Sequence, residues 1–339
     1  MGRLVCLLAL VLGACAAPPA PIPADRPIEL AGELEIHVLD VGQGDAILIR
    51  TPEGRTVLYD GGPSRTAALD HLRELGVESL DLVVASHPHA DHIGGLAAVI
   101  EAYRPPSVLD NGLPHTTQTY ERYLVAVHEA GSRLLEPEAR TLTLGSVALD
   151  VLPPPGVASW GLNDNSVGIV VRFGAFRMTL GGDAEGRQWA WWLDEGHVPE
   201  GPVEVHKASH HGSRNGDTAG AIGRLAPRTV VIGVGAGNQF GHPHDEALAL
   251  YRGVGATIVR TDRDGTVSIT ATSDGRFRVG TEDSSLSHRA RTGYDSIESI
   301  PPKGDDHAPL GFTNGSGHFH PAGSGRGGGT DRGRHRRRG

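Results

Sequence analysis

The first pattern along the chain is an alternation of polar and apolar residues. Residues 33–41 alternate with a period of two, which is typical of a half-buried strand. A turn at residues 42–45 leads to a strand expected at residues 46–50, and residues 51–54 turn the chain back into residues 55–60. The folded part is therefore expected to open with an antiparallel meander.

Segments with helical and strand-like patterns alternate through the rest of the chain. Helices are expected at residues 67–75, 94–103, 119–129, 185–193, 219–225 and 245–251. Further strands are expected at residues 80–86, 108–110, 147–152, 166–173, 176–180, 203–208, 229–233, 257–261, 267–271 and 277–279. Because strands and helices are mixed in both halves, we expect the α+β class, with two packed sheets flanked by helices.

The N-terminal end has the pattern of an export signal. Arg3 precedes a short apolar stretch, residues 4–12, that is too short to cross a bilayer. Residues 12–15, Leu-Gly-Ala-Cys, resemble the bacterial lipobox, whose cysteine is lipidated. We expect a signal peptide at residues 1–14, lipidation at Cys15, and an exported, membrane-anchored lipoprotein facing outside the cytoplasm. An ordinary cleaved signal with a chance cysteine is the alternative.

Low-complexity segments flank the expected domain. Residues 15–29 contain the lipidated cysteine and a proline-rich stretch, which predicts an extended spacer. Residues 283–339 are rich in Gly, His and Arg and have no hydrophobic periodicity, so we expect a disordered tail. One folded domain is therefore expected at residues 30–282.

Charge and cysteine content restrict the chemistry of this domain. Residues 27–282 hold 33 Asp plus Glu and 20 Lys plus Arg, a net charge of −13, and Lys207 is their single lysine. Such an acidic domain repels polyanions at long range, which argues against strong non-specific binding of DNA. The cysteines are Cys6 and Cys15 alone. A metal in the domain would therefore be bound by nitrogen and oxygen ligands.

A cluster of histidines follows one of the expected strands. Residues 87–92 read His-Pro-His-Ala-Asp-His, which places three imidazoles and one carboxylate within six residues. These groups are the ligands of zinc, manganese or iron sites. Gly94 and Gly95 follow, and they would let the next helix approach closely. This pattern predicts a metal site with room for two cations.

Several motifs in order resemble the metallo-β-lactamase superfamily, and in particular its branch with the hydrolase domain of the bacterial DNA-uptake channel protein ComEC. The resemblance covers residues 33–280. It rests on residues 39–46, 59–62, 87–96, 163–166, 180–183, 207–213, 241–244 and 260–262. It implies a four-layer αββα sandwich that carries a metal-dependent hydrolase.

The resemblance also implies roles for individual residues. Two divalent metals, zinc or manganese, would be bound by His87, His89, Asp91, His92, Asp183 and His210. Asp183 would bridge the two metals, and Asp91 and Asp183 would be the catalytic carboxylates. His211 is the alternative to His210, because the two histidines are adjacent.

The chain departs from the superfamily pattern at one ligand. Relatives place a histidine between the first cluster and the bridging aspartate, whereas residues 163–166 here read Asn-Asp-Asn-Ser. Asn165 is therefore a candidate ligand, or a residue that holds one in place. A site with more oxygen ligands favours manganese.

Three further residues have two readings each. Asp60 either orients a ligand histidine or caps a turn. His242 either holds substrate or is an exposed loop residue. Lys207 either contacts a phosphate or supports its strand.

The mechanism implied by the resemblance is hydrolysis by a metal-bound hydroxide, since a metal lowers the pKa of its water to about 7. The implied substrate is a phosphodiester, with an extracytoplasmic nuclease acting on DNA as one possibility. A hydrolase of a lactam or another ester and a non-catalytic metal-binding surface lipoprotein are the alternatives. No protein partner is inferred.

Overall fold

Two β-sheets run through the part of the chain that the computed structural model describes, residues 32–282. The signal peptide, Cys15, the spacer and the tail expected from the sequence lie outside these residues. Between residues 32 and 282, no helix has the length and apolar character needed to cross a membrane.

The first sheet has eight strands. In spatial order they are β15 (Phe277–Thr281), β14 (Val267–Ala271), β1 (Leu34–Val38), β2 (Ile47–Arg50), β3 (Thr56–Tyr59), β4 (Leu82–Val84), β5 (Ser107–Leu109) and β6 (Arg133–Leu135). The strands from β15 to β3 pair antiparallel, which confirms the opening meander, and those from β3 to β6 pair parallel.

The second sheet has seven strands. In spatial order they are β13 (Thr257–Arg260), β12 (Thr229–Ile232), β11 (Val205–Lys207), β10 (Phe176–Leu180), β9 (Gly168–Phe173), β8 (Val147–Leu152) and β7 (Thr141–Leu144). The strands from β7 to β10 pair antiparallel, and those from β10 to β13 pair parallel.

The core between the sheets follows from the alternation in the sequence. In β1, Leu34, Ile36 and Val38 are fully buried, while the residues between them are partly exposed. They belong to one apolar cluster with residues of the second sheet such as Val171 and Met178. The period of two thus places one face of each sheet in a shared core.

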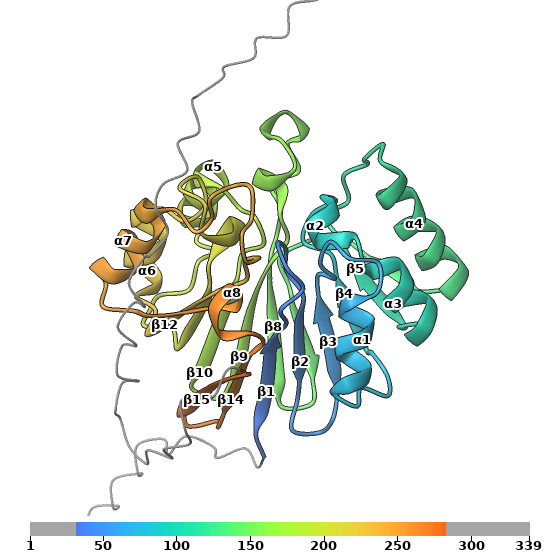
Figure 1. Cartoon of the computed structure of the whole chain (residues 1–339), viewed down its shortest axis with the longest axis horizontal. Coiled ribbons are helices and arrows are strands. Elements are labelled where there is room, and N and C mark those ends of the chain that lie inside the picture. Colours follow the sequence, from blue (N-terminus) through green and yellow to red (C-terminus); the bar gives the residue numbers. More distant parts are fainter. Residues whose placement is uncertain (1–31, 283–339) are drawn as a thin grey trace, which may run out of the picture. The chain divides into compact units, whose positions relative to one another are not determined.

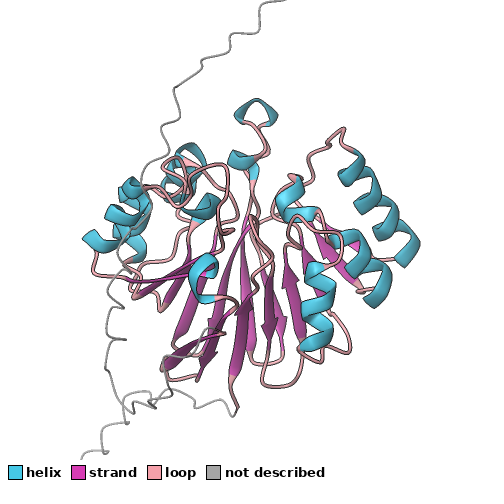
Figure 2. Ribbon diagram, in the orientation of Figure 1, coloured by secondary structure: helices cyan, strands magenta, loops and turns pink. Residues whose placement is uncertain are grey.

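Helices cover the outer face of each sheet (Figures 1 and 2). On the first sheet they are α1 (Ala67–Glu74), α3 (Leu96–Tyr103) and α4 (Gln118–Ala130). On the second they are α5 (Gly186–Asp194), α6 (Ala219–Leu225) and α7 (Asp245–Gly253). The expected four-layer αββα sandwich is confirmed.

Short helical turns occupy the loops. They are α2 (Ala90–Ile93), η1 (Ala158–Trp160), η2 (Asn163–Asn165), η3 (Ser209–Gly212) and α8 (Thr261–Asp264). Three of these turns lie next to strand ends that carry candidate site residues. The turn α2 follows β4, η2 precedes β9, and η3 follows β11.

Candidate metal centre

The candidate ligands come from loops at the ends of strands in both sheets. His87 and His89 follow β4 of the first sheet, and the short helix α2 then carries Asp91 and His92. Asp183 follows β10, and η3 follows β11, in the second sheet. The sandwich therefore brings residues that are more than a hundred positions apart in the sequence to one site.

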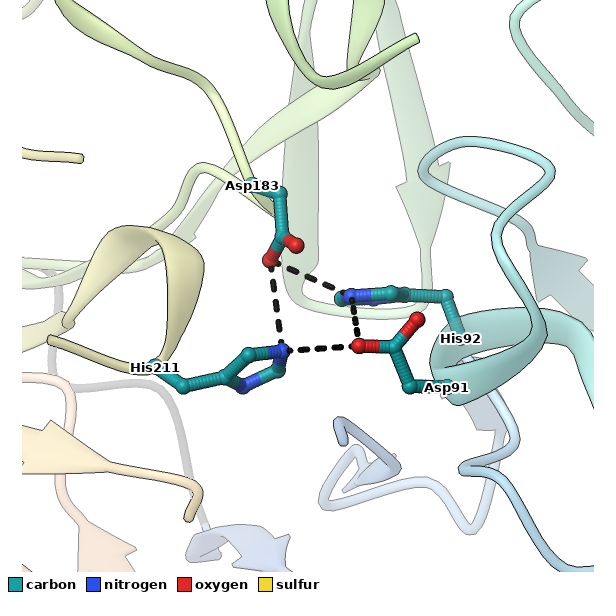
Figure 3. Close-up of side chains that lie close together, drawn as sticks. All are labelled: Asp91, His92, Asp183 and His211. Carbon is teal, nitrogen blue, oxygen red and sulfur yellow. Dashed lines mark ion pairs between the residues drawn. The ribbon is translucent and has the colours of Figure 1, made fainter. Parts of the chain in front are cut away.

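Four of these side chains converge on one point (Figure 3). The Nε2 atom of His92 lies 3.1 Å from Oδ1 of Asp183, and Nε2 of His211 lies 3.5 Å from the same oxygen. The distance from His211 Nε2 to Asp91 Oδ2 is 3.4 Å. One ligand atom from each residue therefore lies within reach of a single cation, since the four atoms all lie within 4.8 Å of one another.

The atoms that face this point lack hydrogen-bond partners. In the described part of the chain, His92 Nε2, Asp183 Oδ1 and His211 Nε2 are buried and make no hydrogen bond, although both nitrogens lie within ion-pair distance of the Asp183 oxygen. A buried polar atom without a partner costs about 1–3 kcal/mol, so three together are unfavourable unless something binds them. Imidazole nitrogen and carboxylate oxygen are ligands of zinc and manganese, and the donor set fits such a cation.

A second group lies beside the first and shares Asp183 with it. His87, His89 and Asp183 also bring one atom each within ligand distance of one another. His87 Nε2 lies 2.9 Å from His89 Nδ1 and 3.8 Å from Asp183 Oδ2. The His and Asp cluster is thus suited to a dinuclear metal site, with one carboxylate common to both positions.

Hydrogen bonds behind the cluster fix which nitrogen faces it. His92 donates from Nδ1 to Oδ2 of Asp60 at 2.8 Å, and Asp60 accepts from the backbone of Ser86 at 2.7 Å. His211 donates from Nδ1 to the carbonyl of Gly233 at 2.9 Å. Each bond leaves Nε2 free for a cation. Asp60 therefore lies where it orients a histidine of the cluster, which was one of its two readings.

Carboxylates around the cluster shift the pKa of its imidazoles. Burial alone would lower the pKa of His211, but Asp183 and Asp45 raise it to about 10. Burial would also lower the pKa of His92, which Asp183 and Asp60 instead raise well above its usual range. The surplus of negative charge that causes both shifts also attracts cations.

The adjacent histidines of η3 point in different directions. Both have positive φ, 49° for His210 and 54° for His211. The His211 side chain is 1% exposed and belongs to the four-residue group, whereas that of His210 is 21% exposed and belongs to neither group. His210 Nε2 lies 3.7 Å from Asp183 Oδ2, and His211 Nε2 lies 3.5 Å from Asp183 Oδ1. The geometry therefore favours His211, the alternative to His210, as the candidate ligand.

Two other candidates lie away from the cluster. Asn165 is fully buried, but its amide bonds the backbone of Val157 and Gly161. Lys207 is also buried, and its ammonium lies 2.8 Å from Asp45 Oδ1 and donates to the carbonyl of Ala208 at 2.9 Å. Neither side chain belongs to the candidate ligand groups, because the amide of Asn165 bonds the backbone and the ammonium of Lys207 is paired with Asp45.

A pocket of about 210 Å³ opens beside the cluster. Its lining is Gln43, His89, Asp91, Asn163, Asp183, His210, His211, Phe240 and His242. His242 therefore lies in the pocket lining, a position from which it could contact a substrate. Burial and the neighbouring His210 and His211 lower the pKa of His242 to about 4, so its ring is neutral at pH 7.

Several residues in or beside this pocket were not predicted from the sequence. Asn163 lies in the segment Asn-Asp-Asn-Ser, but the candidate ligand in that segment was Asn165, two positions later. Glu185, two positions after Asp183, accepts a hydrogen bond from Asn163 Nδ2 at 3.0 Å. Its proximity to the predicted bridging carboxylate was a signal that could have found it. Phe240 was missed because an isolated aromatic residue in a loop carries no pattern.

Comparison with known proteins agrees with this site. Residues 39–275 match the family model of the Metallo-beta-lactamase superfamily, and the chain belongs to that superfamily. The match and the His and Asp cluster together define a metal-dependent hydrolase.

Individual relatives share less of their length with this chain. It is 26% identical over 261 residues to ComE operon protein 3 of Bacillus subtilis, an alignment that covers 70% of this chain and 33% of that protein. It is 24% identical over 245 residues to Recombination protein 2 of Haemophilus influenzae, with 69% and 28% covered. The chain spans about a third of the length of these relatives. Among solved structures, the metallo-beta-lactamase fold protein YhfI from Bacillus subtilis aligns with 74% of this chain and 100% of its own, at 14% identity and a TM-score of 0.46.

Proposed function

We propose that this chain is a phosphodiesterase that uses two divalent cations, zinc or manganese. In this proposal His87 and His89 would hold one cation, Asp91, His92 and His211 would hold the other, and Asp183 would be shared by both. The observation that carries the proposal is the convergence on one point of three buried ligand atoms that make no hydrogen bond.

The residues of the chain position the reaction. When bound, the cations acidify a water molecule and stabilise the negative charge that develops on the substrate. Asp60 and Gly233 orient the imidazoles of His92 and His211 through their Nδ1 atoms. The reacting group would enter through the pocket beside Asp183.

A phosphodiester is supported by the names of the relatives and by the ligand types. Recombination protein 2 of Haemophilus influenzae and Competence protein ComA of Neisseria gonorrhoeae, 28% identical to this chain over 240 residues, are named for recombination and competence, and a phosphodiester is the bond that joins nucleotides in DNA. Yet no lysine or arginine lines the pocket in the described part of the chain, and residues 27–282 carry a net charge of −13. We therefore propose that the substrate is a short or small phosphodiester rather than a long duplex, which basic residues would have to bind.

Hydrolysis of bis-p-nitrophenyl phosphate tests the proposal. The full chain should hydrolyse it with manganese or zinc, and a chelator should abolish the activity until the metal is restored. Asp91→Ala should lower kcat/KM by more than about 10³-fold, because it removes a ligand of the cation that acidifies the water. Asp70→Ala, on the exposed face of α1, is the matched control. Full activity of Asp91→Ala would contradict the mechanism.

The same assay separates the alternative functions. A protein that opens a chromogenic lactam but hydrolyses no phosphodiester would be a metallohydrolase of another substrate class. A protein that binds metal but hydrolyses neither would be the non-catalytic lipoprotein.

We also propose that the protein is exported and held at a membrane through lipid on Cys15. The support is the apolar segment at residues 4–12 and the lipobox-like residues 12–15. Cys15→Ser should move the protein from the membrane fraction to the soluble fraction. A wild-type protein that is already soluble would contradict the anchor.

A further inference from the structure

His210 faces the pocket without belonging to either group of candidate ligands. Its backbone is fixed in the left-handed region, with φ 49° and ψ 44°. Its amide donates to the carbonyl of Gly182 at 3.1 Å, and its own carbonyl accepts from Ser213 at 2.8 Å. The side chain is 21% exposed, so it lies at the pocket surface while its neighbour His211 is buried. A strained residue held this firmly at a pocket indicates a functional position.

A carboxylate faces one edge of the ring of His210. Nδ1 of His210 lies at an ion-pair distance of 3.1 Å from Oε1 of Glu185, and Asn163 donates a hydrogen bond to the same oxygen at 3.0 Å. Since Glu185 occupies the Nδ1 side of the ring, Nε2 is the nitrogen left for the pocket.

The other edge of the ring lies at the proposed reaction centre. Nε2 is 3.7 Å from Oδ2 of Asp183, the oxygen opposite the one that faces His92 and His211. The ring of His242 lies 5.5 Å away at 80°. The lining holds no lysine or arginine, so its imidazoles and amides are the groups that can donate a hydrogen bond to an anionic oxygen. With Nδ1 facing Glu185, His210 donates from Nε2 when both of its nitrogens carry a proton.

We propose that His210, oriented by Glu185, contacts a non-bridging oxygen of the phosphoryl group undergoing hydrolysis. This inference rests on the proposed phosphodiesterase function and deepens it. His210 is then a substrate-binding residue, Glu185 is a positioning residue, and neither is a metal ligand.

Three variants of the metal-loaded full chain test the inference. Asparagine tolerates the left-handed region better than most residues, so His210→Asn removes the ring with little change of the backbone. Glu185→Gln keeps the shape of the positioning residue. His244→Asn is the matched control, since His244 is a loop histidine 4.9 Å from the ring of His242 and outside the pocket lining.

The measurements are metal content by mass spectrometry, kcat and KM for bis-p-nitrophenyl phosphate, and the inhibition constant of inorganic phosphate. His210→Asn should keep the metal content of the wild type, lower kcat/KM by about 10²-fold, and weaken inhibition by phosphate. Glu185→Gln should lower kcat/KM by about 10-fold with unchanged metal content. His244→Asn should match the wild type.

Each other outcome overturns a different statement. Loss of metal in His210→Asn would make His210 a ligand and overturn the inference. Unchanged kcat/KM and unchanged phosphate inhibition in that variant, with an active wild type, would overturn the inference alone. A metal-loaded wild type that hydrolyses no phosphodiester would overturn the proposed function and this inference with it.

Discussion

Asn165 illustrates how one buried side chain shapes the metal centre without touching it. Its Oδ1 accepts from the backbone of Val157 at 3.0 Å, and its Nδ2 donates to the carbonyls of Val157 and Gly161 at 3.0 and 2.6 Å. These bonds hold the loop that leads into η2, from which Asn163 reaches the pocket. Asn165, a candidate ligand in the sequence, thus holds a loop in place.

Asn165→His should destabilise the protein rather than strengthen zinc binding. Histidine cannot form all three bonds, so a polar side chain at this fully buried position would lack partners, which costs about 1–3 kcal/mol. We expect a lower free energy of unfolding in urea and an unchanged or weaker zinc affinity by isothermal titration calorimetry. Asn215→His, at an exposed position, is the control. Tighter zinc binding by Asn165→His would show that position 165 does reach the metal.

The element that carries His210 and His211 is held from behind by one carboxylate. Oδ2 of Asp217 accepts from Nε2 of His206 at 3.1 Å, from the backbone of Ser209 at 3.1 Å and from the hydroxyl of Tyr251 at 2.7 Å. Asp217 thereby connects β11, η3 and α7, and its side chain is fully buried. This network fixes the first residue of η3, Ser209, next to the strained backbone of His210 and His211.

Removing Asp217 should destabilise the protein in a pH-dependent way. Burial alone would raise the pKa of Asp217, but the charge of His206 and the hydrogen bonds from His206 and Tyr251 lower it. A lowered pKa in the folded state stabilises the protein above about pH 4, the pKa of an unfolded aspartate, and this stabilisation is lost as pH falls through the folded pKa.

Urea unfolding of metal-free Asp217→Ala measures this effect. We expect the free energy of unfolding to fall by roughly 3 kcal/mol at pH 7, and the difference from the wild type to shrink below about pH 4. Asp194→Ala, at the exposed end of α5, is the control. A difference that stays constant down to pH 3 would mean that Asp217 acts by packing alone.

At this scale the sequence predicts elements whose residues bury one face. The strand Val147–Leu152 and the helix Ala219–Leu225 begin and end at the expected residues. The strands β6 and β7 were not predicted. Both lie at the edge of a sheet and expose residues such as Leu134, 47% accessible, so neither has the alternation of buried and exposed residues that predicts a strand.

The same limit applies to the site. Residues 87–92 are visible as a local cluster, whereas Asp217 and Gly233 gain their roles only through contacts made by the fold.

One buried ion pair joins the two halves of the whole sandwich. Lys207 ends β11 of the second sheet, and Asp45 lies in the loop between β1 and β2 of the first, 162 positions away. Both side chains are at most 1% exposed. Burial alone would raise the pKa of Asp45, but Lys207 and His211 lower it to about 2. Asp45 Oδ1 also lies 3.5 Å from His211 Nδ1, so the pair that joins the sheets also contacts a candidate ligand.

Breaking this pair should weaken the whole molecule rather than one loop. Lys207→Met leaves the buried charge of Asp45 without its partner, which costs roughly 3–5 kcal/mol, whereas the double variant Asp45→Asn with Lys207→Met removes both charges and should recover part of that loss. Urea unfolding of the metal-free protein, followed by far-ultraviolet circular dichroism, measures the free energies of unfolding of the wild type and of the single and double variants.

Arg278→Met, which breaks the exposed pair with Glu33 at 3.0 Å, is the control and should change the free energy of unfolding by at most about 1 kcal/mol. Because both sheets share one core, the unfolding transition should stay single in every variant. If Lys207→Met were as stable as the control, the pair would not couple the two sheets, and the burial of the only lysine in residues 27–282 would need another cause.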